Sequence, residues 1–458
     1  MKRHVAKSVN SHQHFLLRPP CLRVSVVLLT LLTGCTVHPR GELAARQEAL
    51  AAGTPYAAPF EKRELPELQA DAGPEELARY ALLANGDVEA KYWAWRAALE
   101  QVPMAGTQKA GVEVSLETMI TSGQSALADT TLRIANDAMN SLQLPTKLGT
   151  DAQRALHEAQ AAGRRFDQAR WELRSQVLTA YYDYALTAEL ARLEDANTQL
   201  LDMMAQVTES RVATGMASQT DLLKAGNETA MSRNAAAALR GKLPGERAAL
   251  NGLLGRPGAA ALDVPPALPA ERELKAGDAE LLAAAAKNNP ELEALAHDAA
   301  ANADAIKRAR LEYLPDFNVG ISSDLAGVTQ TIMGSVVVPY LRHEAIDAGI
   351  RAAEANLRQT EAMQRQTARS VAARILGDLA MLREAQRQTE ALEKDLIPQA
   401  QRIVEASQTA YASGNGGMID LLDSQRSILV LQRMAAEMRM ERAKQAADLE
   451  GVCGGLPE

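Results

Sequence analysis

Two segments of this chain, about 200 residues apart, carry nearly the same phrase. Residues 211–223 read Arg-Val-Ala-Thr-Gly-Met-Ala-Ser-Gln-Thr-Asp-Leu-Leu, and residues 411–422 read Tyr-Ala-Ser-Gly-Asn-Gly-Gly-Met-Ile-Asp-Leu-Leu. Aligning Asp221 with Asp420 gives an offset of 199 residues. Each phrase ends one long Ala-, Gln- and Arg-rich helical run and begins another. A helix–turn–helix duplicated at this spacing indicates two copies of one structural unit.

The helices before the two phrases are expected to be very long. Residues 148–212 and 342–411 contain few residues able to stop a helix. At 1.5 Å per residue, a run of about 65 residues reaches about 95–100 Å. The runs end at Gly215 and Gly414, and shorter returning helices are expected over 219–254 and 419–449. A further helix is predicted from about residue 74 to residue 101.

Two short segments change from a helical period to an alternating one. Val112, Val114 and Leu116 alternate with polar residues, which predicts a β-hairpin within 111–145. A second hairpin is predicted over 316–339, where Phe317 and Ile321 lie on the apolar face. Residues 135–144 also fit a helix, so two structures stay open there.

The composition favours long, thin helical packing. Aromatic residues make up 3% of the chain, too few for broad cores. The net charge is −8 although the first 34 residues hold five basic and no acidic residues, which disfavours nucleic acid as a partner. No catalytic, phosphate-binding, metal or cofactor motif is present, so we predict no enzyme. The fold class predicted is mainly α with a small β part, built from duplicated long-helix hairpins.

The N-terminus is typical of an exported protein. A basic start and a nine-residue apolar run, 24–32, predict a signal peptide over 1–34, since a helix that crosses a bilayer needs about 20 residues. Leu-Thr-Gly-Cys at 32–35 resembles the lipobox of bacterial lipoproteins, which implies acylation of Cys35 and an outer-membrane destination. The alternative is an ordinary signal peptide with an incidental cysteine. Residues 35–72, without periodicity, are interpreted as a lipid-anchored tether.

The remaining chain divides by the repeat. The first copy is assigned to 73–254 and the second to 287–452, with a Pro-rich irregular connector over 255–286 and a short tail over 453–458. Cys453 is left without a disulfide partner in the mature chain.

Four short amphipathic strands raise the question of how their edges are closed. Spanning barrels begin at about eight strands, and open edges in lipid cost several kcal/mol per unpaired group. Three copies would supply twelve strands. The alternative is a periplasmic coiled-coil scaffolding lipoprotein whose hairpins never enter the bilayer.

The order helix, hairpin, Pro, long helix, Gly turn and Asp-Leu-Leu helix, repeated twice, resembles the outer-membrane factor (TolC-like) family. Its strongest local match is the segment 411–425, from Tyr411 through Gly414 to Asp423 and Gln425. The resemblance implies a homotrimer with one shared 12-stranded β-barrel in the outer membrane and a helical periplasmic tunnel. It also implies a passive exit duct that works with a periplasmic adaptor and an inner-membrane pump.

The same resemblance assigns roles at the helix turns. Asp420 and Asp423 are the implied periplasmic gate; the alternative for Asp420 is a helix cap. Tyr411 is implied to bond across to Asp221, beside Thr220; alternatively it only packs between coils. The turns at Gly215 and Gly414 are the implied adaptor contacts. Some members carry a basic residue where Gly416 stands here, so the closing network is expected to differ.

Overall fold

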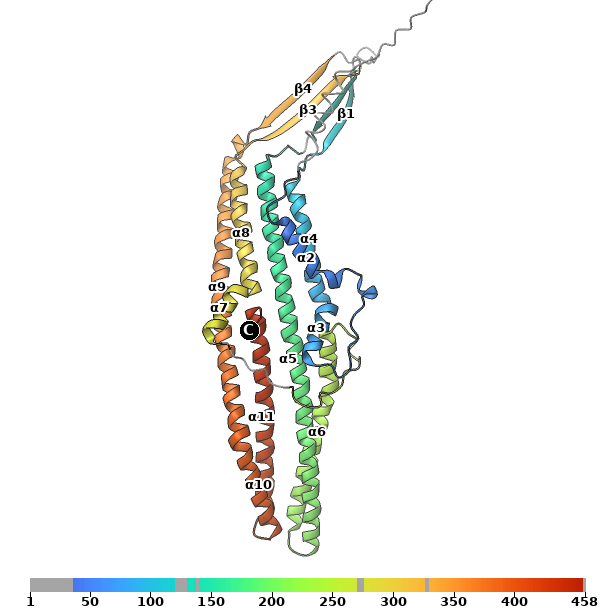
Figure 1. Ribbon diagram of the computed structural model, residues 1–458, viewed down its shortest axis with the longest axis vertical. Helices are drawn as coiled ribbons and strands as arrows, with labels where there is room; N and C mark the ends of the chain where they lie inside the picture. Colours follow the sequence, from blue (N-terminus) through green and yellow to red (C-terminus); the bar gives the residue numbers. More distant parts are fainter. Residues whose placement is uncertain (1–35, 120–129, 137–139, 270–275, 326–328, 456–458) are drawn as a thin grey trace, which may run out of the picture.

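The computed structural model describes residues 36–119, 130–136, 140–269, 276–325 and 329–455. Cys35 and the tips of both hairpins therefore lie outside the described residues. Figure 1 shows an elongated molecule, with a small sheet at one end, two helix turns at the other and long helices between them. Among the described residues, none of the helices combines the length and apolar character needed to cross a bilayer.

The long helices form where the sequence predicts them. Helix α5 runs over Pro145–Ala213 and returns as α6, Gln219–Leu253. Its 69 residues span about 100 Å, and Pro145 suits its first turn because the missing N–H has no intrahelical acceptor there. In the second copy α9, His343–Ala391, continues through a π-helical segment into α10, Ile397–Ala412, and returns as α11, Met418–Cys453.

The π-helical segment, Leu392–Leu396, ends two residues before Pro398. Proline has no N–H to donate to the carbonyl four residues earlier, so the α-helical hydrogen-bond pattern cannot continue unchanged through Pro398. The chain keeps its direction by widening one turn. The long run thus continues past Pro398, as expected, but with a local change of helix type.

The single helix predicted over 74–101 is wrong in one respect, because it is divided at Asn85. Helix α3 covers Pro74–Ala84 and α4 covers Gly86–Gly106. The second copy repeats this division with α7, Asp278–Asn288, and α8, Pro290–Leu311, separated by Asn289. Helix α7 also corrects the expectation that the connector is irregular throughout.

The two asparagines make equivalent contacts. Asn85 Oδ1 accepts hydrogen bonds from the backbone N–H groups of Asp87 and Val88, and Asn289 Oδ1 accepts one from Leu292. Their Nδ2 groups donate to carbonyls at the ends of the two returning helices, Leu253 at 3.0 Å and Val452 at 2.8 Å. Each asparagine therefore caps one helix and secures the end of another in its own copy.

The four strands form one antiparallel sheet in the order β1-β2-β3-β4. They cover Val112–Thr118, Thr130–Asn136, Asp316–Asp324 and Gln330–Val337. Both predicted hairpins are confirmed, and the first hairpin's second strand continues to Asn136, so a helix starting at residue 135 is excluded. Leu142 then pairs with Phe317 as an isolated bridge. Within the described chain, β1 and β4 are the sheet's edges.

A buried lysine joins the sheet to the long helices. Lys147, in the first turn of α5, has a side chain only 1% exposed. Its Nζ donates to the carbonyl of Leu314 at 2.9 Å and to Asp316 Oδ1 at 2.8 Å. The start of α5 in the first copy is thereby fixed to the start of β3 in the second.

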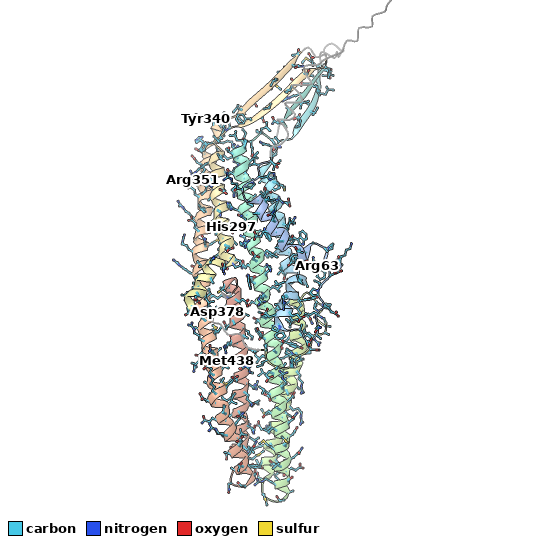
Figure 2. The ribbon with its side chains drawn as sticks, in the orientation of Figure 1. Arg63, His297, Tyr340, Arg351, Asp378 and Met438 are labelled. Atoms are coloured by element: carbon cyan, nitrogen blue, oxygen red, sulfur yellow. The ribbon has the colours of Figure 1, made fainter. Side chains whose placement is uncertain are left out.

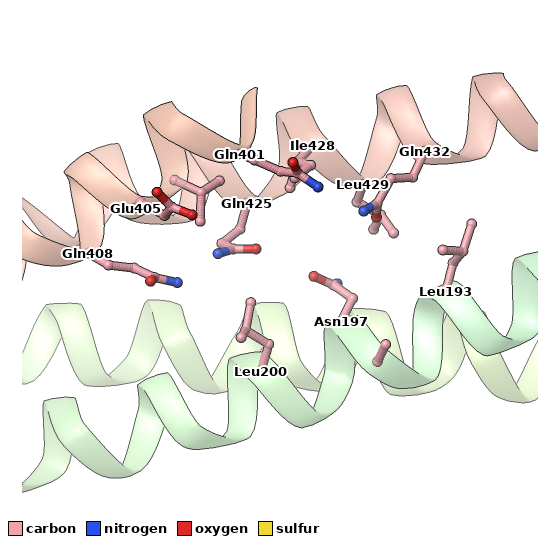
Figure 3. A pocket seen from close by; sticks show the side chains of 12 residues that line it. Leu193, Asn197, Leu200, Gln401, Glu405, Gln408, Gln425, Ile428, Leu429 and Gln432 are labelled. Atoms are coloured by element: carbon pink, nitrogen blue, oxygen red, sulfur yellow. The ribbon is translucent and has the colours of Figure 1, made fainter. Parts of the chain in front are cut away.

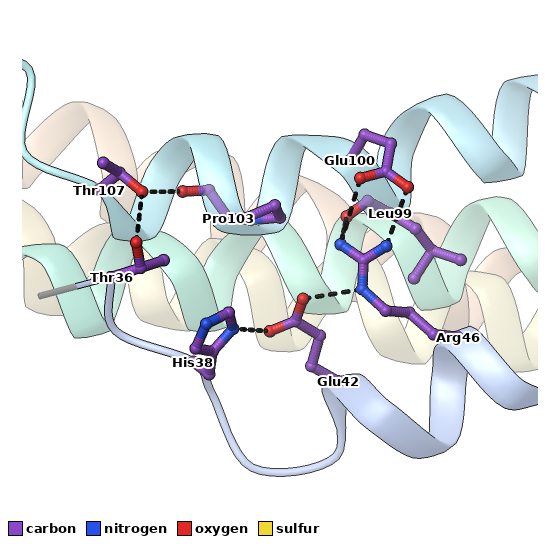
Figure 4. A network of polar contacts seen from close by, with 8 residues as sticks. All are labelled: Thr36, His38, Glu42, Arg46, Leu99, Glu100, Pro103 and Thr107. Carbon is purple, nitrogen blue, oxygen red and sulfur yellow. Dashed lines mark hydrogen bonds and ion pairs between the residues drawn. The ribbon is translucent and has the colours of Figure 1, made fainter.

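The segment 36–72, interpreted as a tether because it lacks clear periodicity, has regular local structure. It contains a helix, α2 (Glu42–Ala52), and two single 3-10 turns. Tyr56 is buried against Tyr92 and Phe166, and Arg46 binds Glu42 and Glu100 (Figure 4). The pattern was missed because only a few of its residues, such as Ala45 and Ala49, face the core.

Candidate gate at the helix turns

The two helix turns have the same backbone geometry. Gly215 and Gly414 have φ angles of 75° and 79°, in the left-handed region that favours glycine. Arg211 O accepts from Met216 N at 2.8 Å, and Ala410 O accepts from Asn415 N at 2.9 Å. These two bonds are related by the 199-residue offset, which confirms that the repeated phrase encodes a repeated turn.

The returning helices begin differently. Ser218 and Asp221 form a capping box at the start of α6, in which the Asp221 N–H donates to Ser218 Oγ at 3.1 Å. Thr220 beside them is exposed. Helix α11 follows Gly417 and has no side-chain cap hydrogen bond. Asp221 therefore serves as a helix-capping residue here, whereas Asp420 is exposed and has no such role in this conformation.

Asp423 lies one turn further along α11 and is also exposed. It accepts from Arg426 Nη1 at 3.2 Å, and Arg426 also bonds to Glu228 of α6. Arg426 thereby links α11 of the second copy to α6 of the first. Of the two predicted gate carboxylates, Asp423 is partly neutralised and Asp420 is not.

Tyr411 is buried between the two helix pairs. Its hydroxyl oxygen lies 3.0 Å from Thr208 Oγ1, and the guanidinium of Arg211 lies 4.6 Å from the ring centroid. Arg211 also donates to the backbone carbonyl of Tyr411. The structure therefore brings Tyr411 to Thr208 and Arg211, while Asp221 bonds to Ser218. Within one protomer, the side-chain partner of Tyr411 is therefore Thr208 and not the predicted Asp221.

Thr208 and Arg211 are functional candidates that the sequence reasoning missed. Arg211 opens the first copy of the repeated phrase, so its position was visible, but its partner 200 residues away was not. Some family members carry a basic residue at the position of Gly416, and the closing network of this chain was expected to differ there. Arg211 from the first copy supplies a basic group at that turn instead.

A polar layer crosses the bundle further from the turns. Glu194 of α5 is 3% exposed. Its carboxylate accepts one hydrogen bond from Arg433 of α11 at 3.0 Å and another from Ser232 of α6 at 3.0 Å. Beside this layer, α5 and the α10–α11 pair enclose an open groove of about 340 Å³. Figure 3 shows the amides of Asn197, Gln401, Gln408, Gln425 and Gln432 among the side chains that line it.

Comparison with known proteins shows what the chain is similar to. Residues 281–455 match the model of the outer membrane efflux protein family. The resemblance is confirmed. No curated protein gives a significant match to the chain. The matched family consists of efflux proteins and not enzymes, in agreement with the sequence-based prediction.

Solved structures of outer-membrane proteins share the fold over nearly their whole length. The channel OprN aligns with a TM-score of 0.72 at 16% identity, covering 86% of this chain and 94% of OprN. VceC of Vibrio cholerae gives 0.70 at 17% identity, covering 83% and 96%. The open state of MtrE of Neisseria gonorrhoeae gives 0.68 at 18% identity, covering 86% and 96%. The chain thus has the outer membrane efflux protein fold, mainly helical with a small sheet.

Proposed function

We propose that this protein is the outer-membrane channel subunit of a tripartite efflux or secretion system, a passive trimeric duct gated at its periplasmic turns. The observation that carries the proposal is a row of apolar residues across all four strands. Val114 pairs with Ile134, Ile134 with Ile321, and Ile321 with Ile332. The next row, Ser115, Arg133, Ser322 and Thr331, is polar and lies on the opposite face.

This pattern fits a sheet that has lipid on one face and water on the other. Val114 and Ile332 are 64% and 71% exposed in one protomer, so the apolar face has no cover of its own. A spanning barrel alternates apolar outward and polar inward residues. The edges β1 and β4 would pair with neighbouring copies, and three copies close a 12-stranded barrel. A scaffold outside the membrane would leave this face in water.

The position of Thr36 and Val37, which follow Cys35, supports acylation of that cysteine. Thr36, the next residue, has its Oγ1 3.1 Å from Thr107 Oγ1, and Val37 N donates to Gly106 O at 2.9 Å. These contacts hold Thr36 and Val37 beside Thr107, five residues before β1 begins, at the end of the sheet nearest the helices. An acylated Cys35 would be anchored to the same membrane that the strands enter. Mass spectrometry of the mature chain and of Cys35→Ala tests this, since an unmodified wild-type Cys35 would contradict it.

The turns carry exposed apolar side chains that suit a periplasmic adaptor. Met216 is 71% exposed, Leu223 66% and Ile419 50%, close to the Gly215 and Gly414 turns. Binding there would favour the open arrangement of the coils over the closed one. Met216→Asp with Ile419→Asp should abolish export by the assembled system without changing the trimer's mass.

The gate assigned to Asp420 and Asp423 is tested by conductance. Three copies of each would place six carboxylates around the axis, which attracts cations and resists closer approach. Purified protein should have the native mass of a trimer and form discrete channels in a planar bilayer. Asp420→Ala with Asp423→Ala should raise the conductance several-fold and reduce cation selectivity. The control pair Asp87→Ala with Glu291→Ala removes exposed acids from helix starts remote from the turns and should change neither.

The alternative scaffold has a distinct outcome. A monomer, or a trimer that stays silent even after removal of both gate aspartates, would overturn the channel proposal and favour the scaffold.

A further inference from the structure

The flank formed by α9 carries basic side chains without local partners. Arg351, Arg358, Arg365 and Arg369 are spaced by seven, seven and four residues, which places them on one helix face, and all four are exposed. Among the described residues, none of the four has an acidic oxygen within ion-pair distance. This is unusual in a chain whose net charge is −8.

The opposite flank carries exposed acids without local partners. Glu61, Glu64, Glu67 and Asp71 lie in the segment 60–73, here named the acidic strap, and none of them forms an ion pair within the described chain. The strap is held in place by Arg63, whose guanidinium donates to Glu89 of α4 at 2.7 Å and to the carbonyl of Ala58. The arrangement leaves these acids facing outward.

The two flanks lie at the same level of the molecule. Figure 2 places Arg63, inside the strap, between the levels of Arg351 and Asp378 on the other side. Arg358, Arg365 and Arg369 belong to the α9 segment between those two residues.

The spacings of the opposed charges also match. Seven residues of α-helix, from Arg358 to Arg365, rise about 10.5 Å. Three residues of extended chain, from Glu64 to Glu67, cover about 10 Å. Leu65 N donates to Arg63 O at 3.1 Å, so the chain turns at Glu64, and Pro66 favours an extended Leu65 after that turn. The distance between two carboxylates of the strap is therefore similar to the distance between two guanidinium groups of α9.

The open sheet edges bring these flanks together between copies. Helix α4 leads into β1, and α9 follows β4. If β4 of one copy pairs with β1 of the next, α9 lies beside the neighbour's α4 and the strap that covers it. We infer that the arginine face of α9 binds the acidic strap of the adjacent copy, so that the segment after the N-terminus clamps neighbouring subunits together. This inference rests on the proposed trimer.

Charge reversal tests the clamp in the full-length protein. Arg358→Glu, Arg365→Glu and Arg369→Glu together should increase the dissociated fraction in detergent at low salt by at least about tenfold, the scale of close charge pairs. Glu61→Lys, Glu64→Lys and Glu67→Lys should do the same. Combining both sets in one chain should restore the trimer. Lys224→Glu with Lys242→Glu, on exposed α6 positions, is the matched control and should have no effect.

The outcomes separate this inference from the proposed function. A wild-type trimer that neither reversal weakens would overturn the clamp and leave the channel intact, whereas a wild-type monomer would overturn the channel itself. If only the arginine set matters, α9 binds a different anionic partner and the clamp is wrong. As a second measurement, Arg365→Cys with Glu64→Cys should form a disulfide between subunits, and Arg365→Cys with Lys224→Cys should not.

Discussion

The hydroxyl oxygens of Thr208 and Tyr411 lie 3.0 Å apart and join the two helix pairs just above their turns. Tyr411→Phe removes this bond, while Thr208 Oγ1 keeps its own bond to the Met204 carbonyl. The loss is about 1 kcal/mol, equivalent to about a fivefold change in an equilibrium. We expect Tyr411→Phe to raise the open probability in single-channel recordings about that much. An unchanged open probability would show that the contact does not oppose opening.

Arg211 is expected to oppose channel opening more strongly than the Tyr411 hydroxyl does. Its guanidinium contacts both the ring and the backbone carbonyl of Tyr411. A lysine keeps the charge but not the planar stacking. Arg211→Lys and Arg211→Ala should therefore both open the channel more often than Tyr411→Phe does. If Arg211→Lys behaves as wild type, charge alone is sufficient and the stacking is incidental.

The paired asparagines predict equal costs in the two copies. Asn85→Ala or Asn289→Ala removes a helix cap, which costs about 1 kcal/mol, and also leaves a carbonyl of Leu253 or Val452 without its donor. Asn→Ser at either site retains a cap and lacks the Nδ2 donor. Urea denaturation followed by circular dichroism should rank wild type above serine and serine above alanine at both sites. Unequal orders at the two sites would contradict the equivalence.

Lys147 should be needed to orient the sheet on the helices. Lys147→Met keeps the stem and removes the charged donor to Leu314 and Asp316. Hydrogen bonds to charged groups contribute about 1.5–3 kcal/mol. We expect a loss of that size in detergent unfolding, together with fewer assembled trimers. Lys287→Met, an exposed lysine of α7, is the control and should be neutral.

The features that could be predicted from the sequence are those that local periodicity and the repeat determine. The long helices, the hairpins and the Gly215 and Gly414 turns depend on residues close together in the chain. The partner of Tyr411 could not be predicted in this way, because Thr208 lies 203 residues away. The folded segment 36–72 was missed for a similar reason. Tyr56 is buried by Tyr92 and Phe166, not by neighbours in its own segment.

The Cys453 thiol should not react with a maleimide until the second copy of the repeat unfolds. Burial, with the nearby Asp378, raises the pKa of its thiol to about 11, so little thiolate forms at pH 8. Native protein should not react with a maleimide at that residue, and protein in urea should react completely. Rapid modification of the native protein would show that the ends of α11 and α7 separate readily.

Acid should weaken the junction between the two copies at His297. This residue of α8 stacks on His157 of α5 at 6.2 Å between ring centroids. Burial, followed by the neighbouring His157 and Arg164, lowers the pKa of His297, while Glu293 and Asp298 oppose the shift. The buried Asp304 faces His157 Nε2 at 3.6 Å.

The sign of the effect follows from that lowered pKa. The folded state binds fewer protons than the unfolded one, so the contribution is complete above about pH 6.5 and is lost as pH falls through the folded pKa. His297→Gln should flatten the dependence of melting temperature on pH between about 7 and 5, whereas His343→Gln, on an exposed side chain, should not. Parallel curves for wild type and His297→Gln would show that the junction does not respond to this histidine.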